Sequence, residues 1–207
     1  MPFHITEQRS RVVAALSSTV RCGNGPLARL IREGGLHCVF QPIGDLRAGT
    51  VFAHEALIRG PLESPFHRPD FLLEMARREH ALQDFELMCV YTALQNWAAI
   101  GAPGRLFVNI SADALVQGVA LCGADRLAGT LRDFGALPRM VVLEITEHER
   151  VTDMAPLREA VKAVHAAGMR LALDDFGDGR SSLRLWSEVK PDFVKIDKYF
   201  IQAIAEH

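Results

Sequence analysis

The sequence lacks the long apolar runs, the excess charge and the cysteine spacing that mark several classes of protein. No stretch approaches the roughly 18 uninterrupted apolar residues of a membrane-spanning helix. The net charge of -2 offers no electrostatic basis for binding duplex nucleic acid. The four cysteines are widely spaced and form no C-x-x-C motif, so we expect neither a disulfide framework nor a zinc site. These absences favour a globular protein of the reducing cytoplasm.

What is present is the composition of an ordinary globular domain. The chain has 207 residues, which is long enough to bury a sizeable core. Of these residues, 49% are apolar and 23% are charged, which is typical of globular domains. The first 35 residues predict two short helical stretches, at Arg11–Val20 and from Pro26, the second ending at Gly34–Gly35. We therefore expect an N-terminal helical segment, residues 1–35, leading into one domain, residues 36–207.

Strand-like and helical patterns alternate through that domain. Asp70–Trp97 predicts two helices, and Pro156–Ala167 predicts another that ends at Gly168. The short link Gly44–Gly49 predicts a hairpin between the first two strands. Strands that alternate with helices indicate an α/β fold with a mainly parallel sheet. Six runs are typical of strands: Cys38–Ile43, Val51–Ile58, Arg105–Ile110, Met140–Ile145, Arg170–Asp174 and Asp192–Ile196.

Oxygen-bearing side chains follow the apolar part of these strands. They are Glu55, Asn109, Glu144, Asp174 and Asp175. In a parallel β/α barrel the C-terminal strand ends converge on the active site, so these residues would form one all-oxygen cluster. Such a cluster suits Mg²⁺ or Mn²⁺ better than zinc or copper. Lys195, on the sixth run, would then orient an attacking water or neutralise a phosphate oxygen.

Each of these residues also has a purely structural interpretation. Glu55 could be a solvated charge at a strand end, and Lys195 could extend to the rim of the barrel. Asn109 or Ser111 could cap the following helix. Asp174 and its neighbour could belong to a turn. The joint pattern across several strands nevertheless favours one shared site.

The chain contains several short motifs, each of which occurs once. They are FQPI with Gln41, EALIRG with Glu55-Ala56-Leu57, FVNIS with Asn109, LEITE with Glu144 and Glu147, DDFGDGRSSL from Asp174, and KPDFVKID from Lys190. Together they resemble the EAL family of cyclic di-GMP phosphodiesterases, over about Leu27 to the C-terminus. The resemblance implies a TIM-like (β/α)8 barrel whose first strand is antiparallel. It also implies Mg²⁺- or Mn²⁺-dependent hydrolysis of cyclic di-GMP to linear pGpG.

The resemblance further implies a role for each matching residue. The first-metal ligands would be Glu55, Asn109, Glu144 and Asp174, and the second-metal contacts Asp174 and Asp175. The catalytic residues would be Lys195, which holds the hydrolytic water, with Glu55 and Asp175. The substrate contacts would be Gln41, Leu57 and Arg59, with Asp197 beside them. Glu147 would anchor the loop after Asp175. A catalytically silent cyclic di-GMP receptor or interaction module remains the alternative function.

Two departures from the family pattern stand out. The loop carries Asp178 and Arg180, where the family has a small or hydroxyl residue and an aromatic residue. Six strand patterns are present, whereas a closed barrel has eight strands. We therefore expect a C-terminally incomplete domain from a longer protein, with a natural truncation as the alternative, and negligible hydrolysis by this chain alone. A homodimer and further domains are left open as partners besides cyclic di-GMP.

Overall fold

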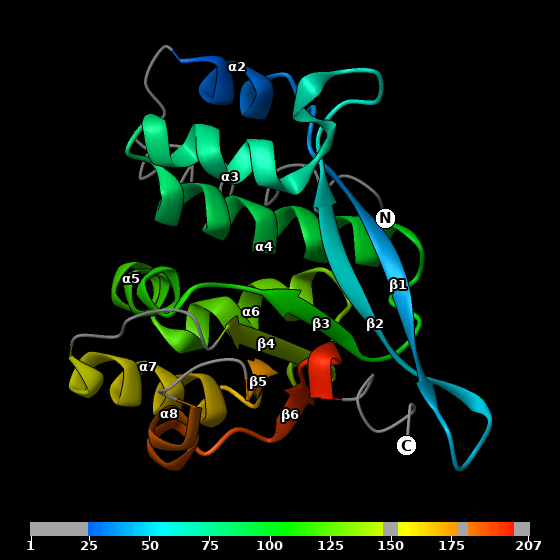
Figure 1. Ribbon diagram of the computed structural model, residues 1–207, viewed down its shortest axis with the longest axis vertical. Coiled ribbons are helices and arrows are strands. Elements are labelled where there is room, and N and C mark those ends of the chain that lie inside the picture. Colours follow the sequence, from blue (N-terminus) through cyan, green and yellow to red (C-terminus); the bar gives the residue numbers. More distant parts are fainter. Residues whose placement is uncertain (1–24, 147–152, 178–181, 201–207) are drawn as a thin grey trace.

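The computed structural model describes residues 25–146, 153–177 and 182–200, whose strands form one six-stranded sheet in the order β1 to β6 (Figure 1). The first pair, β1 and β2, is antiparallel, and the other neighbouring pairs are parallel. The mixed, half-barrel sheet agrees with the predicted fold class. The strands are β1 (His37–Asp45), β2 (Thr50–Arg59), β3 (Leu106–Asn109), β4 (Val141–Thr146), β5 (Arg170–Phe176) and β6 (Phe193–Ile196).

The hairpin predicted between the first two strands is confirmed. Asp45 ends β1, and its Oδ1 accepts hydrogen bonds from the backbone N–H groups of Arg47 and Ala48 at 2.8 and 3.0 Å. Gly49 closes the turn with a φ of +65°, which suits glycine because it has no Cβ. So short a link can join antiparallel strands but not parallel ones, which need a longer crossover.

Helices supply the crossovers between the parallel strands. The two helices expected in Asp70–Trp97 are α3 and α4, and the one expected before Gly168 is α7. Gly168 has a φ of +87°, as a residue just past a helix end often does. The helices are α2 (Pro26–Arg32), α3 (Pro69–Arg78), α4 (Leu82–Ala99), α5 (Ala112–Cys122), α6 (Ala124–Asp133), α7 (Met154–Ala166) and α8 (Ser182–Val189), with single 3-10 turns at Pro65–His67 and Pro138–Met140. No described helix has the length and apolar character needed to cross a membrane.

The main core lies between the sheet and these helices. Trp97 on α4 and Leu106 on β3 are at most 1% exposed, as are Leu143 on β4 and Leu171 on β5. Burying one such side chain stabilises the fold by about 1.5–3 kcal/mol. The helix α2 joins a smaller cluster with α3 and α4, whose members are Leu27, Leu30, Leu72, Ala76 and Phe85. In Figure 1 these three helices lie together beside the β1–β2 hairpin. The division into residues 1–35 and 36–207 stays a prediction.

Asp192 ties the start of β6 to β5 and α7. Its carboxylate accepts a hydrogen bond from the Leu171 N–H at 3.0 Å and one from Arg170 Nη1 at 2.6 Å. His165 Nε2 lies 3.0 Å from the same carboxylate. Burial acts to raise the pKa of Asp192, but these three partners outweigh it and hold the pKa below its ordinary value. The ionised carboxylate therefore stabilises the folded state.

We expect Asp192→Asn to lower the free energy of unfolding at pH 7 by about 1–3 kcal/mol, because an amide loses the ion pairs. The folded-state pKa of Asp192 lies below that of the unfolded chain, about 3.9, so the wild-type advantage is complete above that value. It is lost as the pH falls through the folded-state pKa. Urea unfolding followed between pH 7 and pH 3 measures both effects.

The matched control is Glu159→Gln. Glu159 pairs with Lys162 on α7, but both side chains are 71% exposed, so this substitution should change the free energy of unfolding very little. Equal losses for the two variants would contradict the role assigned to Asp192.

Candidate metal and substrate site

The candidate site lies directly above an apolar floor inside the sheet. Ala53, Phe107, Val142 and Ala172 form a buried cluster there, with Phe193 packed against it. Side chains two residues apart on a strand share a face, so the residue two positions further along each strand also points inward. Those residues, on β2 to β6 in turn, are Glu55, Asn109, Glu144, Asp174 and Lys195. The alternation of five strands thus places five polar side chains in one layer over an apolar one.

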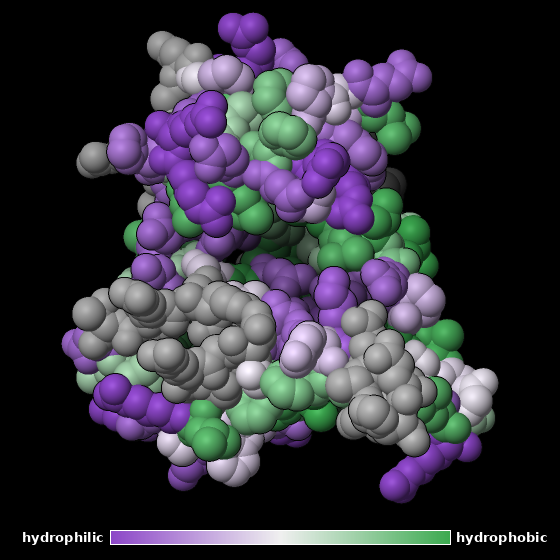
Figure 2. Space-filling model, viewed as in Figure 1, coloured by the Kyte–Doolittle hydropathy of each residue, from purple (hydrophilic) through white to green (hydrophobic). Residues whose placement is uncertain are grey.

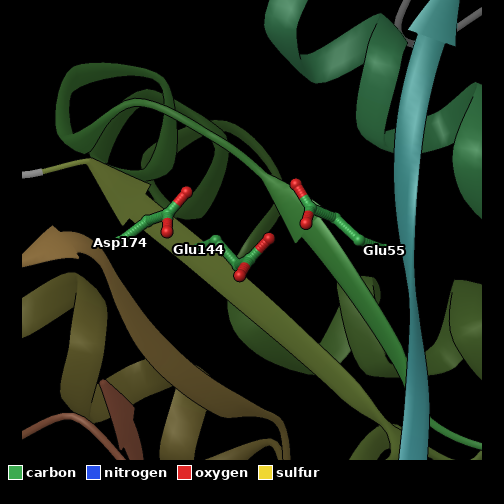
Figure 3. Close-up of side chains that lie close together, drawn as sticks. All are labelled: Glu55, Glu144 and Asp174. Carbon is green, nitrogen blue, oxygen red and sulfur yellow. The ribbon is translucent and has the colours of Figure 1, made fainter. Parts of the chain in front are cut away.

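Three of these side chains are carboxylates whose oxygens lie within 4.8 Å of one another: Glu55, Glu144 and Asp174. Figure 3 shows them pointing toward one another from three different strands. The Glu144 side chain is 0% exposed, and those of Glu55 and Asp174 are each 17% exposed. Within the described residues, neither Glu144 oxygen makes a hydrogen bond. Buried carboxylates of this kind are unfavourable unless a cation compensates for their charge.

Lys195 is the compensating side chain that the structure shows. Its Nζ lies 3.0 Å from Glu55 Oε2, 2.9 Å from Glu144 Oε1 and 3.3 Å from Asp174 Oδ1. One ammonium group therefore contacts three carboxylates that come from residues far apart in the sequence.

The crowding of charge changes the proton affinities in the cluster. The pKa of Glu144 is raised to about 7, chiefly by burial; the Lys195 ammonium acts to lower it, and the negative charges of Glu55 and Asp174 act to raise it. Burial acts to lower the pKa of Lys195, but the carboxylates, with Glu144 first, raise it above its ordinary value overall. The ammonium group consequently stays charged throughout the physiological pH range.

Asn109 belongs to the cluster rather than to the helix cap. Its Nδ2 donates a hydrogen bond to Glu55 Oε1 at 3.1 Å. The cap of α5 is Ser111, whose Oγ accepts a hydrogen bond from the Ala114 N–H at 3.1 Å. A carboxylate oxygen accepts this hydrogen bond, so the amide nitrogen of Asn109, and not its oxygen, faces Glu55.

Asp175 differs from its neighbour Asp174. The pairing of β5 with β6 shifts its register between Leu173 and Phe176, and Asp175 has a φ of +55°. Such a bulge re-aims the side chains around it. Asp175 is not a member of the carboxylate group within 4.8 Å, so its assignment as a second-metal contact stays a prediction. The loop residues Glu147, Asp178 and Arg180 lie outside the described residues.

Asp197 has structural partners at the end of β6. Its N–H donates to the Phe176 carbonyl at 3.3 Å, and its Oδ1 accepts a hydrogen bond from the Tyr199 N–H at 2.7 Å. The first bond joins the end of β6 to β5, and the second lies in the turn that follows the strand. The substrate contact expected of Asp197 stays a prediction.

A pocket of about 310 Å³, within the size range of small-molecule sites, adjoins the cluster at Asn109, whose amide bonds to Glu55. The expected substrate contacts Leu57 and Arg59 line it, together with Asn109. The third expected contact, Gln41, is exposed and pairs with Glu55 in the β1–β2 register. Figure 2 shows this face of the molecule hollowed between the helical part that contains α3 and α4 and the part below it. The geometry therefore places the Arg59 guanidinium in a pocket that shares Asn109 with the carboxylate cluster.

The pocket also has lining residues that the sequence analysis did not single out, among them Cys38, Arg77, Glu86 and Cys89, and it includes Ser111, which was expected only as a helix cap. Glu86 accepts hydrogen bonds from the Ser111 hydroxyl and from the Ser111 N–H, the latter at 3.2 Å. Burial raises the pKa of Glu86 above its ordinary value. In the sequence, the one sign that Glu86 lines a site was its charge within the mostly apolar helix α4.

Comparisons with known proteins identify the family of this chain. The sequence profile of the EAL domain matches residues 25–207. The chain belongs to the EAL-domain family. This EAL chain is 31% identical over 178 residues to the cyclic di-GMP phosphodiesterase PA2567 of Pseudomonas aeruginosa. It is 26% identical over 169 residues to the blue light- and temperature-regulated antirepressor BluF of Escherichia coli.

Solved structures lead to the same family. A Klebsiella pneumoniae BlrP1 complex with calcium and cyclic di-GMP is 29% identical, with a TM-score of 0.71 over 82% of this chain and 42% of that one. The EAL chain covers 30% of PA2567 and 40% of BluF, so it spans less than half the length of these curated relatives. The matched parts cover 84% and 80% of the EAL chain itself.

We expect Ser111→Ala to destabilise the fold by about 1 kcal/mol, because α5 loses its N-cap and Glu86 loses a hydroxyl donor. Thermal unfolding at pH 7 measures the loss. Ser187→Ala is the control, since the Ser187 hydroxyl bonds only to the Arg184 carbonyl on the exposed side of α8 within the described residues. A Ser111 variant as stable as the Ser187 variant would contradict this assignment.

Proposed function

We propose that the protein is a metal-dependent phosphodiesterase that hydrolyses cyclic di-GMP to linear pGpG. The observation that carries the proposal is the convergence of Glu55, Glu144 and Asp174 within 4.8 Å, beside a pocket lined by Arg59. Two relatives support it, since PA2567 is named a cyclic di-GMP phosphodiesterase and BlrP1 was solved with cyclic di-GMP and calcium or manganese.

The residues present fit a divalent cation. The carboxylates and the Asn109 amide form an all-oxygen donor set, and both oxygens of the buried Glu144 lack a hydrogen bond within the described residues. We therefore assign Glu55, Asn109, Glu144 and Asp174 as the residues that would hold Mg²⁺ or Mn²⁺, with Asp175 toward a second ion. When bound, such an ion supplies an acidified water and stabilises the charge that develops on phosphoryl oxygens.

The pocket residues bind and orient the substrate. Arg59 Nη1 donates to the Ile58 carbonyl at 2.8 Å, which holds the guanidinium group at the pocket wall. Its remaining donors match two phosphate oxygens in bidentate fashion. Leu57 offers an apolar surface to a guanine base, and Gln41, opposite Glu55, offers a polar contact. These contacts would fix the scissile phosphodiester beside the carboxylates.

Lys195 positions the water that attacks phosphorus. Its ammonium group has three N–H donors and contacts Glu55, Glu144 and Asp174, so a donor becomes free for water or phosphate when one of these contacts is released. A hydrogen bond donated to the water oxygen would orient the remaining lone pair of the water toward phosphorus. A hydrogen bond donated to a phosphoryl oxygen would offset the negative charge that develops there. The apolar floor beneath the cluster strengthens both effects because it keeps the local dielectric low.

We expect Arg59→Ala to weaken cyclic di-GMP binding by about ten- to a hundredfold, because charge-assisted hydrogen bonds to phosphate are lost. Isothermal titration with cyclic di-GMP in the presence of Ca²⁺ measures the affinity. The control is Arg47→Ala, since Arg47 is exposed in the β1–β2 turn and does not line the pocket. Equal affinities of the two variants for cyclic di-GMP would show that Arg59 does not bind the substrate.

We expect Lys195→Ala in the full-length protein to reduce kcat far more than it raises KM, because the water contact acts in the transition state. Chromatography of pGpG formed with excess Mn²⁺ gives both constants. An unchanged kcat with a raised KM would refute the proposed role. The negligible activity expected of residues 1–207 alone stays a prediction and is measured in the same assay.

A cyclic di-GMP receptor without turnover is the second candidate function. The observation in its favour is the similarity to BluF, whose name describes an antirepressor rather than an enzyme. The pGpG assay on the full-length wild-type protein separates the two. Tight cyclic di-GMP binding without any formation of pGpG would contradict the phosphodiesterase function and support the receptor function.

A further inference from the structure

The Lys195 ammonium and a bound metal ion would both offset the negative charge of Glu55, Glu144 and Asp174. Glu144 is 0% exposed, and neither of its oxygens makes a hydrogen bond in the described part of the chain. The Lys195 ammonium lies 2.9–3.3 Å from an oxygen of Glu144 and of each of the other two carboxylates. It is therefore the internal counter-ion of the cluster.

A divalent cation cannot share the cluster with Lys195 in this position without strong repulsion. Such cations bind carboxylate oxygens at about 2.0–2.6 Å, so an ion on these carboxylates would lie within about 6 Å of Lys195 Nζ. Positive charges at that separation, over an apolar floor, repel each other far more than in water. Either the ion or the ammonium group must therefore move away from the carboxylates.

The ammonium group is the partner that can move. The Lys195 side chain is 30% exposed, whereas Glu144 is 0% exposed within the sheet. Lysine carries its charge on a flexible four-carbon chain, so the ammonium group can turn toward solvent while the strands stay in place. The carboxylates therefore define the site, and Lys195 sets how easily a cation enters it.

We propose that Lys195 competes with the divalent cation for Glu55, Glu144 and Asp174, so that metal binding requires the ammonium group to move aside. The inference deepens the proposed function and rests on it, since it takes a divalent cation as the ligand of these carboxylates. Displacement would leave Lys195 at the edge of the metal, where it could hold the hydrolytic water.

The proposal predicts two opposite effects of removing the charge. Lys195→Met retains an apolar chain of similar length but leaves the carboxylates without their ammonium partner. Its melting temperature in EDTA should fall below that of the wild type, because the carboxylates then repel one another. Its affinity for Mn²⁺ should rise by about tenfold or more, because the ion no longer displaces a cation.

The test titrates Mn²⁺ into the full chain and follows free Mn²⁺ by electron paramagnetic resonance, with melting temperatures in EDTA and in Mn²⁺. Lys195→Gln is the second neutral variant, in case Lys195→Met does not fold, and Lys195→Arg keeps the charge and should bind like the wild type. Lys162→Met is the matched control, since it removes the same charge from a side chain that is 71% exposed on α7.

Tighter Mn²⁺ binding by Lys195→Met and Lys195→Gln, but not by Lys162→Met, would support competition. Equal or weaker binding by both neutral variants would overturn it and leave the phosphodiesterase proposal intact. If wild type and all variants bind no Mn²⁺, the competition and the metal dependence both fail. If the neutral variants bind Mn²⁺ more tightly than the wild type but the full-length protein forms no pGpG, competition stands and the hydrolytic function fails.

Discussion

The site depends on the compensation of negative charge around Glu144. A carboxylate with no solvent exposure is strongly unfavourable by itself, and here two more carboxylates lie beside it. The Lys195 ammonium, which comes from β6, offsets part of this charge at 2.9 Å from Glu144 Oε1. Three carboxylates and one ammonium group still leave a negative excess when all are ionised. That excess is the electrostatic basis of the proposed divalent-cation site.

The apolar floor explains why the charges act so strongly on one another. Phe107, Val142, Ala172 and their neighbours exclude water from beneath the cluster. In such surroundings Coulomb interactions are stronger than in water, and an unpaired charge is correspondingly less favourable. The same parallel strands thus provide both the dry base and the polar layer, two residues apart. A change in the register of one strand would move both layers together.

Much of the fold could be predicted from local patterns. The β1–β2 hairpin follows from the short link after Asp45, and the end of α7 follows from Gly168. The six strands appear at the expected places because each is an apolar run bounded by turn residues. The start of α5 was expected from the cap candidate Ser111, which the structure confirms, whereas α6 and α8 were expected only as general helical stretches. Their weak local signals did not define their bounds.

What the sequence alone determined is the set of residue types and their order along the strands. Alternation places Glu55, Glu144 and Asp174 on inward-facing positions, and the EAL motifs identify the family. Only the tertiary structure decided the contact of Lys195 with three carboxylates, since β2 and β6 are far apart in the chain. The bulge at Asp175 and the pairing of Glu86 with Ser111 likewise arise from contacts between separate elements. A local pattern records which face a side chain takes, but the distance between charges depends on the curvature of the whole sheet.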